Sequence, residues 1–483
     1  MSEPLIYELG SPGRKGVRPP ALDVPESDLP DSLVREDLPL PEVSEVDVVR
    51  HFTRLSHLNY AIDIGMYPLG SCTMKYNPKI NEVTARLPGF AGLHPYQDET
   101  TVQGALALMH RMQTYLKEIS GFAGITVQPA AGAQGELVGV LIMRKAQLDR
   151  GETQRDTILI PDSAHGTNPA STSMSGLRVV ELPSDERGNV DLDALREQAC
   201  DRIVGFMITN PNTLGLFEEH IEEVAEIVHG CGGLVYGDGA NMNALVGVMQ
   251  PADVGIDVMH FNLHKTFSTP HGGGGPGAGP VGVVEDLVPY LPDPVVVREE
   301  DADEGVPTYH FHTPARTIGR IKGFWGQFGV LVRAYTYIRM LGADGLRDVA
   351  EHAVLNANYV RSRIAGVYKV PHNRICKHEF VAEGRFKDAP DVNAMDVSKR
   401  LIDYGLHPPT NYFPLIVHDA LMIEPTETES LQSLDQYVEA LLAIAEEAKT
   451  TPDLLHEAPH SAPVRRLDEV RAAREPHLRY EHQ

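Results

Sequence analysis

The sequence predicts an α/β protein with a mostly parallel sheet in a large domain and a smaller α/β domain at its C-terminal end. Short apolar runs alternate with helical stretches through the middle of the 483-residue chain. Such alternation favours a parallel sheet that helices cover on both faces. We therefore expect ligands beyond the carboxyl ends of the strands. The runs that read as buried strands are residues 125–127, 157–160, 204–208 and 233–236.

The composition is that of a globular protein, with 42% hydrophobic and 23% charged residues. The formal net charge of −25 argues against non-specific binding to nucleic acid or to anionic membranes. The four cysteines lie far apart and form no CxxC motif, so neither a disulfide framework nor a zinc site is expected. We find no signal-peptide pattern and no apolar run of about 18 residues, so the expected location is the cytoplasm.

Residues 1–95 are rich in proline and acidic residues and are expected to form an N-terminal arm that needs another surface to pack on. Within the arm, residues 46–58 are predicted to form a helix with Ser44 as its N-cap.

The large domain is predicted to span residues 96–343. It opens with a helix whose apolar positions recur at helical spacing from Leu106 to Ile119 and which ends at Gly121. A second amphipathic helix is predicted at residues 218–228, and a glycine-proline loop at residues 271–282. Residues 317–342 are predicted to be a long helical region that leads into the next domain.

The smaller domain is predicted to span residues 344–450, and residues 451–483 are expected to be a charged tail. The helices predicted in this domain are residues 344–364, 394–404 and 430–448.

Polar residues follow the predicted strands at several points. A site for pyridoxal phosphate needs a lysine amine, a carboxylate beside the pyridine nitrogen, backbone amides for the phosphate and a flat group against the ring. Each of these demands has a candidate here. The polar strings are residues 132–135, 162–168, 209–212, 238–241 and 264–267.

Lys265 is predicted to be the Schiff-base lysine, because it follows a strand-like run and precedes a glycine-rich loop. The alternative is an ordinary surface lysine. Asp238 is predicted to pair with the pyridine nitrogen, because it lies at the end of an apolar strand. Its alternative role is a helix N-cap.

Gly132, Ala133 and Gln134 open a predicted helix and are expected to hold the phosphate. His165 is expected to stack on the cofactor ring, and Asn210 to hydrogen-bond its phenolic oxygen. The alternative role of His165 is that of an ordinary loop histidine, and the alternative role of Asn210 is that of an Asn-Pro turn residue. The predicted catalytic residues are Lys265, His165 and Asp238, and the predicted cofactor-binding set adds Gly132, Ala133, Gln134, Thr167, Asn210, Ala240 and His264; no metal site is expected.

Read together, these strings resemble glycine decarboxylase, the P-protein of the glycine cleavage system, over roughly residues 40–450. The resemblance lies with the carboxyl half of the long single-chain form, so it implies subunit 2 of the two-subunit form. The matching strings are residues 67–78 (YPLGSCTMKYNP), 132–136 (GAQGE), 163–171 (SAHGTNPAS), 236–241 (YGDGAN), 262–267 (NLHKTF), 355–359 (LNANY) and 423–429 (IEPTETE).

This resemblance implies the fold of type I pyridoxal-phosphate enzymes, like that of aspartate aminotransferase. It implies decarboxylation of glycine and transfer of the aminomethyl group to the lipoyl arm of the H-protein, the reaction of aminomethyl-transferring glycine dehydrogenase. It also implies a heterotetramer with a homologous subunit 1. Two rivals remain: another type I enzyme, for which Arg374 or Arg385 would be the candidate carboxylate-binding arginine, and a non-enzymatic partner subunit. Cys72 is expected to have a structural or redox-sensitive role rather than a catalytic one.

Overall fold

A computed structural model describes residues 3–35, 38, 40–271, 277–300, 306–372 and 374–479. The chain forms two compact units, which are residues up to 64 together with residues from 457 on, and residues 65–456. The predicted arm of residues 1–95 is thus divided between the two units. The predicted domain boundaries near residues 95, 343 and 450 stay predictions.

The first unit is built around α1 (Glu45–Leu58), the helix predicted at residues 46–58. The Ser44 hydroxyl accepts the backbone N–H of Asp47 at 3.2 Å, so the predicted N-cap is confirmed. The side chain of Glu3 accepts hydrogen bonds from Arg54 and contacts His51, which ties the start of the chain to α1. The other elements of this unit are η1 (Ile6–Glu8), η2 (Asp31–Leu33) and α13 (Glu469–Arg474).

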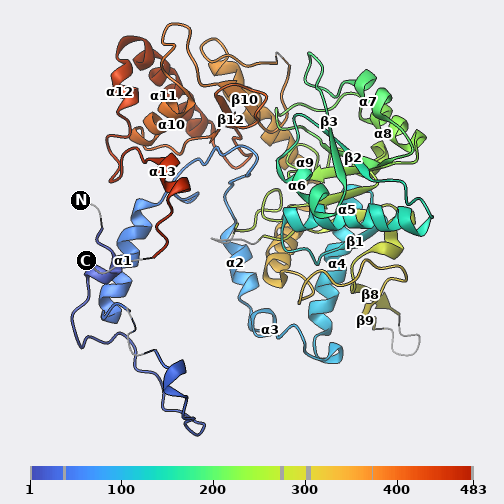
Figure 1. Cartoon of the computed structure of the whole chain (residues 1–483), viewed down its shortest axis with the longest axis horizontal. Helices are drawn as coiled ribbons and strands as arrows, with labels where there is room; N and C mark the ends of the chain where they lie inside the picture. The colour runs from blue at the N-terminus through green and yellow to red at the C-terminus, as the bar shows by residue number, and fades with distance from the viewer. Residues whose placement is uncertain are drawn as a thin grey trace. The chain divides into compact units, whose positions relative to one another are not determined.

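The second unit contains a seven-stranded sheet with the order β1-β7-β6-β5-β4-β2-β3 (Figure 1). The strands from β3 to β6 in this order are parallel, and β7 runs antiparallel to both β6 and β1. The predicted mostly parallel sheet and all of its predicted strands are therefore confirmed. The strands are β1 (Gly124–Thr126), β2 (Thr157–Pro161), β3 (Arg178–Leu182), β4 (Ile203–Thr209), β5 (Leu234–Gly239), β6 (Val258–Phe261) and β7 (Val281–Val283).

Helices bury both faces of this sheet. On one face α5 packs Met143 and other apolar side chains against Tyr236 and Val258. On the opposite face α4, α8 and the start of α9 enclose Phe206 and Phe261. Alternate residues of each strand therefore reach different cores, as a doubly covered sheet requires. The helices are α2 (Lys79–Ala85), α3 (Pro88–Ala91), η3 (Glu99–Thr101), α4 (Gln103–Ser120), α5 (Gly132–Asp149), α6 (Thr167–Met174), α7 (Leu192–Gln198), α8 (Ile221–Gly230), η4 (Pro251–Val254), η5 (Glu285–Tyr290) and α9 (Phe328–Ile364).

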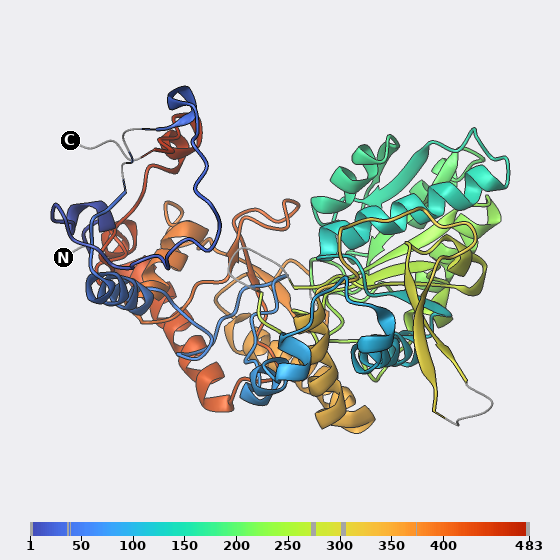
Figure 2. The same cartoon turned by 90° about the horizontal axis from the view of Figure 1, so that it is seen from below.

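A smaller antiparallel sheet has the order β10-β12-β11 and packs against the second half of α9 and two further helices. The helices predicted near residues 394–404 and 430–448 are confirmed here. Its elements are β10 (Phe380–Glu383), α10 (Ala394–Asp403), β11 (Thr410–Asn411), β12 (Ala420–Ile423), α11 (Leu431–Thr450) and α12 (Pro452–His456). A separate hairpin of β8 (Val295–Glu299) and β9 (Thr308–His312) projects beside the large sheet (Figure 2).

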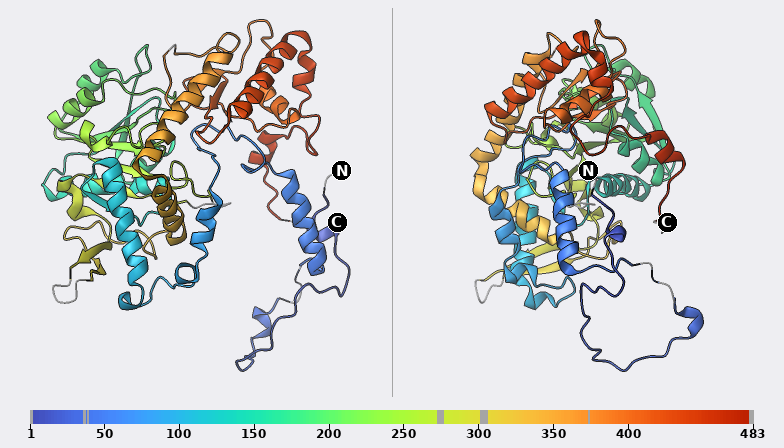
Figure 3. Two further views of the ribbon diagram at one scale, coloured as in Figure 1. Left: turned by 180° about the vertical axis from the view of Figure 1, so that it is seen from behind. Right: turned by 90° about the vertical axis from the view of Figure 1, so that its left-hand side faces the viewer.

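The predicted helix at residues 317–342 was placed too early, because α9 begins only at Phe328. Gly319 and Gly326 take φ values of 93° and 137°, which a right-handed helix cannot contain. A further glycine with positive φ, Gly342 with φ 66°, kinks α9 within its length (Figure 3). The buried residues of α9 up to Ala350 pack in the core of the large sheet, and those from Ala357 on pack in the core of the small sheet.

Other elements differ from the predictions by a few residues. The helix predicted at residues 218–228 begins at Ile221, because Glu218 instead folds its side chain back to accept the backbone N–H of His220. Asp238 lies inside β5, one residue before its end, rather than after the strand. The predicted tail begins with α12, whose Leu455 is fully buried, so residues 452–456 belong to the packed second unit.

Five residues of the predicted glycine-proline loop, 272–276, lie outside the described residues. Among the helices that the structure describes, none is both long enough and apolar enough to cross a membrane.

Candidate active site

A cavity of about 240 Å³ lies beyond the carboxyl ends of β4, β5 and β6. Its position is the one expected for a ligand of a parallel sheet. The cavity is lined by Ser71, Gly132, Ala133, Glu136, His165, Thr167, Thr209, Pro211, Thr213, Asp238, Ala240, Asn241, Asn262, His264, Lys265, His378 and Glu379. All of the predicted site residues except Gln134 and Asn210 are therefore brought together around one cavity.

Lys265 lies in a turn after β6, in which its backbone N–H donates to Asn262 and its carbonyl accepts from Ser268, each at 3.1 Å. Its side chain is half-buried and lines the cavity. Within the described part of the chain, its amine has neither a hydrogen bond nor an ion pair. An amine held at a cavity wall in this way is available to a ligand.

A buried ion pair fixes the segment that follows Lys265. The Lys75 amine donates to the backbone carbonyl of Thr266 at 2.7 Å, to Glu427 at 2.7 Å and to the Tyr337 hydroxyl at 3.1 Å. Burial would lower the pKa of Lys75, but Glu427 and Tyr337 outweigh it and raise that pKa, so Lys75 stays charged. Lys75 therefore positions Lys265, and it was not among the predicted site residues.

Asp238 is buried at the edge of the cavity and accepts the Asn168 side-chain amide at 3.1 Å and the Ala240 backbone N–H at 3.0 Å. Burial alone would raise the pKa of Asp238. His260, these two donors and the charge of Lys265 more than offset burial and hold the pKa below its usual value. Asp238 is therefore an ionised carboxylate, suited to a cationic partner.

Tyr236 and His260 form a chain of polar groups behind Asp238. The Tyr236 hydroxyl lies 2.6 Å from Nδ1 of His260, and Nε2 of His260 lies 3.4 Å from Oδ1 of Asp238. Burial and two nearby carboxylates raise the pKa of Tyr236 far above its usual value, so the phenol keeps its proton. Tyr236 then donates to Nδ1, which leaves the proton of the neutral imidazole on Nε2, facing Asp238.

A second carboxylate, Glu136, lies close to Asp238. Glu136 accepts the Thr167 hydroxyl at 2.7 Å and the Asn168 amide at 3.0 Å, so the amide of Asn168 bridges the two acids. Burial and the charge of Asp238 raise the pKa of Glu136 to about 7. Glu136 and Asn168 were not among the predicted site residues, although both lie inside the strings that carried the family resemblance.

The start of α5 is open to an anion. Its N-cap is Ala131, which has no side-chain acceptor, so the backbone N–H groups of Gly132 and Ala133 have no partner inside the helix. A Cβ on Gly132 would lie 2.8 Å from the Asn262 side chain, which shows how closely the backbone is packed here. Thr209 adds a buried hydroxyl without a hydrogen-bond partner in the described structure. Such a helix start is a ready site for phosphate.

His165 places a flat ring at the cavity wall. Its Nδ1 lies 3.0 Å from the Thr167 hydroxyl, and its ring meets Phe413 edge-on at 5.5 Å. Burial lowers the pKa of His165, so the ring is neutral and can lie against an aromatic ligand. His264 is also neutral, because burial, with help from His271 and Lys265, lowers its pKa to about 3.

Gln134 and Asn210 are turned away from the cavity. The Gln134 side chain accepts the Ala130 N–H at 2.7 Å and donates to the Ile321 carbonyl at 3.1 Å. Asn210 accepts the Glu218 N–H at 3.0 Å, and its neighbours Thr209 and Pro211 line the cavity instead. Both side chains hold the loops of the site, and their predicted ligand contacts stay predictions.

The two arginines weighed as carboxylate ligands do not line the cavity. Arg374 donates to the carbonyls of Arg187 and Phe217, and Arg385 pairs with Asp419. Cys72 is a half-buried free thiol whose pKa is raised, chiefly by burial. This thiol is therefore protonated and a poor nucleophile.

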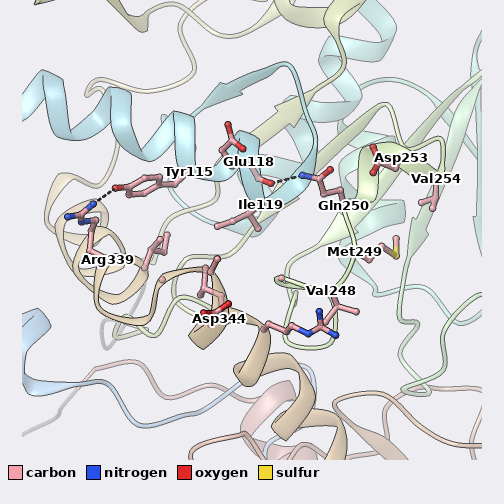
Figure 4. Close-up of a pocket in the computed structure, with 16 residues that line it drawn as sticks. Tyr115, Glu118, Ile119, Val248, Met249, Gln250, Asp253, Val254, Arg339 and Asp344 are labelled. Atoms are coloured by element: carbon pink, nitrogen blue, oxygen red, sulfur yellow. Dashed lines mark hydrogen bonds between the residues drawn. The ribbon is translucent and has the colours of Figure 1, made fainter.

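A more open groove of about 880 Å³ lies between α4, residues 247–254 and the bend of α9 (Figure 4). The Tyr115 hydroxyl accepts from Arg339, and the Gln250 amide donates to the Glu118 carbonyl. Two pairs of its polar groups are thus joined across the groove, and its polar groups do not converge on one point, so the cavity at Lys265 is the better site candidate.

The cavity at Lys265 fits pyridoxal phosphate. Lys265 offers an unpaired amine in the described structure, Asp238 an ionised carboxylate, α5 a helix start with open backbone N–H groups and His165 a flat ring. These groups belong to different elements and converge on one space, which chance placement of a surface lysine would not produce.

Relatives match the chain along almost its whole length. A protein of Desulforamulus reducens described as probable glycine dehydrogenase (decarboxylating) subunit 2 is 54% identical over 99% of both chains. A protein of Pyrococcus horikoshii with the same description is 56% identical over 98% of this chain and 95% of its own. Two family models also match: "Glycine dehydrogenase, C-terminal domain" at residues 349–461 and "Aminotransferase class-V" at residues 140–274.

Solved structures share the fold. A glycine decarboxylase (P-protein) of the glycine cleavage system, in inhibitor-bound form, gives a TM-score of 0.73 at 21% identity and covers 86% of this chain and 93% of its own. A NifS-like protein gives a TM-score of 0.59 at 16% identity, with 79% of this chain and 99% of its own covered. At these identities the two structures establish the fold alone.

The raised pKa of Glu136 predicts a pH-dependent stability of the cofactor-free protein. Between the ordinary value of 4.5 and about 7, the folded state keeps a proton that the unfolded state has lost. The proton on Glu136 therefore contributes fully to the free energy of unfolding below pH 4.5. This contribution falls by roughly 2–3 kcal/mol as the pH rises towards 7. We expect Glu136→Gln to remove this loss, so that its stability relative to the wild type rises by that amount between pH 5 and about 8. Urea unfolding across this range would measure the change, and a constant difference between the two proteins would contradict it.

Proposed function

The chain belongs to the family of glycine dehydrogenase (decarboxylating) subunit 2, and we propose that it is the pyridoxal-phosphate-carrying subunit that removes CO2 from glycine. The observation that carries the proposal is the unpaired amine of Lys265, which shares one cavity with the ionised carboxylate of Asp238. Family membership and site chemistry support the same reaction independently.

The bound cofactor supplies an electron sink for the pair of electrons left when the Cα–carboxylate bond breaks. Lys265 would provide the amine that attaches the cofactor until glycine takes its place. Asp238, oriented by His260 and Asn168, would keep a proton on the pyridine nitrogen. The start of α5 would hold the phosphate and His165 would lie against the ring, so that the protein would fix the reacting bond in a productive orientation.

The aminomethyl group is proposed to pass to the disulfide of a lipoyl arm carried by the H-protein. The family resemblance supports this acceptor, and a lipoyl arm can enter only where the cavity opens to solvent.

A homologous subunit 1 is the proposed partner, in a heterotetramer with two copies of each chain. The relatives are described as subunit 2, which supports the existence of another subunit. In the second unit, Ile80 on α2 is 41% exposed, and Val83 and Leu87 are 58% and 47% exposed. In the first unit, Val46, Val49 and Phe52 recur at helical spacing on α1 and are 53–58% exposed. Apolar stripes of this kind favour a covering partner.

Aminotransferase activity is the alternative function for a protein of this fold. Such enzymes usually hold the substrate carboxylate with an arginine, and none of the described residues that line this cavity is an arginine. A purely structural partner subunit is disfavoured by the convergence of Lys265 and Asp238 on the cavity.

Lys265→Ala is expected to abolish covalent attachment of pyridoxal phosphate and to stop catalysis, because no other amine lines the described cavity. The visible absorption band, its loss on borohydride reduction and glycine–bicarbonate exchange would be measured. Lys145→Ala, which removes an exposed helical ion pair with Asp149, is the matched control and should behave as the wild type. Exchange activity in the Lys265 variant would reject the assignment.

Asp238→Asn is expected to bind the cofactor but to lose the rate by about a hundredfold or more, because a neutral amide cannot stabilise the pyridinium charge. Cofactor affinity and glycine–bicarbonate exchange would be measured separately. Near-normal turnover would show that another group performs this task.

The chain alone is expected to be poorly active or self-associated, and addition of subunit 1 should restore decarboxylation with the lipoyl protein. We expect an apolar interface of at least about 2,000 Å². The measurement is reconstitution at matched cofactor saturation, with size-exclusion chromatography of each mixture. Full activity from a monomer of this chain would overturn the subunit assignment.

A further inference from the structure

A second pair of buried carboxylates, Glu379 and Glu424, lies at the same cavity. Glu379 lines the cavity just before β10, and Glu424 directly follows β12. Each residue is at most 4% exposed. One side-chain ligand atom from each of Glu379, Glu424 and His378 lies within 4.8 Å of the others. Two carboxylates this close and this deeply buried cannot both be ionised.

The hydrogen-bond donors decide which of the two acids carries the proton. Glu424 accepts the Thr73 N–H at 3.0 Å, the Thr73 hydroxyl at 2.8 Å, and the amides of Asn241 and Asn243 at 2.8 and 3.0 Å. Among the described residues, Glu379 accepts only the Ser71 N–H, at 2.7 Å on Oε2. Four donors favour the ionised form of Glu424. Oε1 of Glu379 has no hydrogen-bond donor among the described residues and is the atom on which a proton can reside.

The pKa directions agree with this assignment. Burial, followed by the charge of Glu424, raises the pKa of Glu379 well above its usual value, whereas Lys265 and the Ser71 N–H oppose the rise less strongly. The pKa of Glu424 is also raised by burial, but its donors and Lys265 act against that rise.

His378 adds a buried group without a partner. It is 2% exposed and lines the cavity, and neither of its ring nitrogens has a hydrogen bond in the described structure. Its Nε2 lies 3.6 Å from Oε1 of Glu379. Burial lowers the pKa of His378 to about 3, so the ring is neutral and offers one N–H donor. A buried donor left without an acceptor at a cavity wall points to an acceptor on the ligand.

Backbone packing holds this group of side chains in place. A Cβ on Gly215 would lie 1.8 Å from the Glu379 carbonyl, so only glycine allows the strand leading to β10 to approach so closely. The Lys377 N–H donates to the Gly215 carbonyl at 2.7 Å. Glu379 is therefore fixed against the loop that follows β4, near the cavity that holds Lys265.

We propose that Glu379 is a neutral carboxylic acid which, with His378, donates hydrogen bonds to the carboxylate of the amino-acid substrate, while Glu424 remains the ionised member of the pair. This inference rests on the proposed function and names the residues that recognise the leaving carboxylate. A chelated metal ion fits the same three side chains less well, because Oε1 of Glu424 already accepts three hydrogen bonds.

Neutral donors suit a decarboxylase better than an arginine would. A guanidinium stabilises the carboxylate of the substrate far more than the departing CO2. It would therefore stabilise the ground state more than the transition state and raise the barrier to decarboxylation. Glu379 and His378 orient the carboxylate without supplying positive charge. The nearby negative charge of Glu424 further favours loss of the carboxylate charge as CO2.

The charged and titratable groups around Glu379 come from several elements. They are Glu424 after β12, Lys265 after β6, His378 beside it and the Cys72 thiol in the loop that contains Ser71. His378 and Cys72 are neutral near pH 7, so Glu424 and Lys265 control the proton of Glu379.

The test compares glycine with methylamine, which has the amine but not the carboxylate. Binding to cofactor-saturated protein is followed by the change in visible absorption. We expect Glu379→Ala to weaken glycine binding by about tenfold or more and to leave methylamine binding unchanged. Glu379→Gln keeps a neutral donor and should stay within about threefold of the wild type for both ligands. Glu429→Gln removes a partly buried carboxylate whose pKa is also raised, and it is the matched control outside the cavity.

A second measurement detects the proton of the Glu379 carboxyl group directly, in cofactor-free protein. The infrared C=O band of a protonated carboxyl group should be present at neutral pH in the wild type and reduced in Glu379→Gln. In Glu424→Gln, Glu379 should lose its proton at a lower pH, because its charged neighbour is gone. An unchanged band in Glu379→Gln would overturn the proposal.

The ligand comparison supplies the other decisive outcomes. Equal loss of glycine and methylamine binding in Glu379→Ala, or a loss in Glu379→Gln as large as in Glu379→Ala, would also overturn it. A wild type that responds to neither amine would instead reject the proposed function, while the infrared result would still report on the proton.

Discussion

The buried ion pair of Lys75 and Glu427 is the constraint on which the site depends. Lys75 joins three parts of the second unit, because its amine contacts the turn after Lys265, the hydroxyl of Tyr337 on α9 and the carboxylate of Glu427 beyond β12. Loss of one partner would leave an uncompensated charge in the interior, which is strongly destabilising. The position of Lys265 is therefore tied to the packing of the small sheet on the large one.

Within this frame, Lys265 influences two pairs of coupled carboxylates. Its charge lowers the pKa of Asp238, whose neighbour is Glu136, and opposes the rise in the pKa of Glu379 and Glu424. In each pair, the acid whose contacts better offset burial is the ionised one, namely Asp238 and Glu424. Its neighbour, Glu136 or Glu379, has the higher pKa. The same physical rule thus underlies both proposals, in which Asp238 is the carboxylate for a cationic ring and Glu379 the neutral acid for an anionic substrate group.

Glycines make the close approaches that this arrangement needs. Gly132 brings the start of α5 against Asn262, and Gly215 allows the backbone of Glu379 to pack against the loop after β4. A side chain at either point would separate elements that must share one cavity. The positive φ values of Gly319 and Gly326 have a different effect, since they keep residues 317–327 out of a helix and let Ile321 bond to Gln134.

The sequence by itself determined the sheet, most helices and many of the groups that line the cavity around Lys265, because strands, caps and strand-end polar residues depend on local patterns of burial and turn chemistry. Periodicity located α1 and α4, and the placement of Lys265 and Asp238 after apolar runs located the cavity. Tertiary structure alone decided the roles of Lys75, His260, Glu136 and the pair of Glu379 and Glu424. These side chains act through partners as far as 352 residues away in the chain, such as Glu427 for Lys75, and no local pattern encodes such a contact. Which of two neighbouring acids keeps its proton depends on burial and on the donors that folding brings to it, and these exist only once the chain is folded.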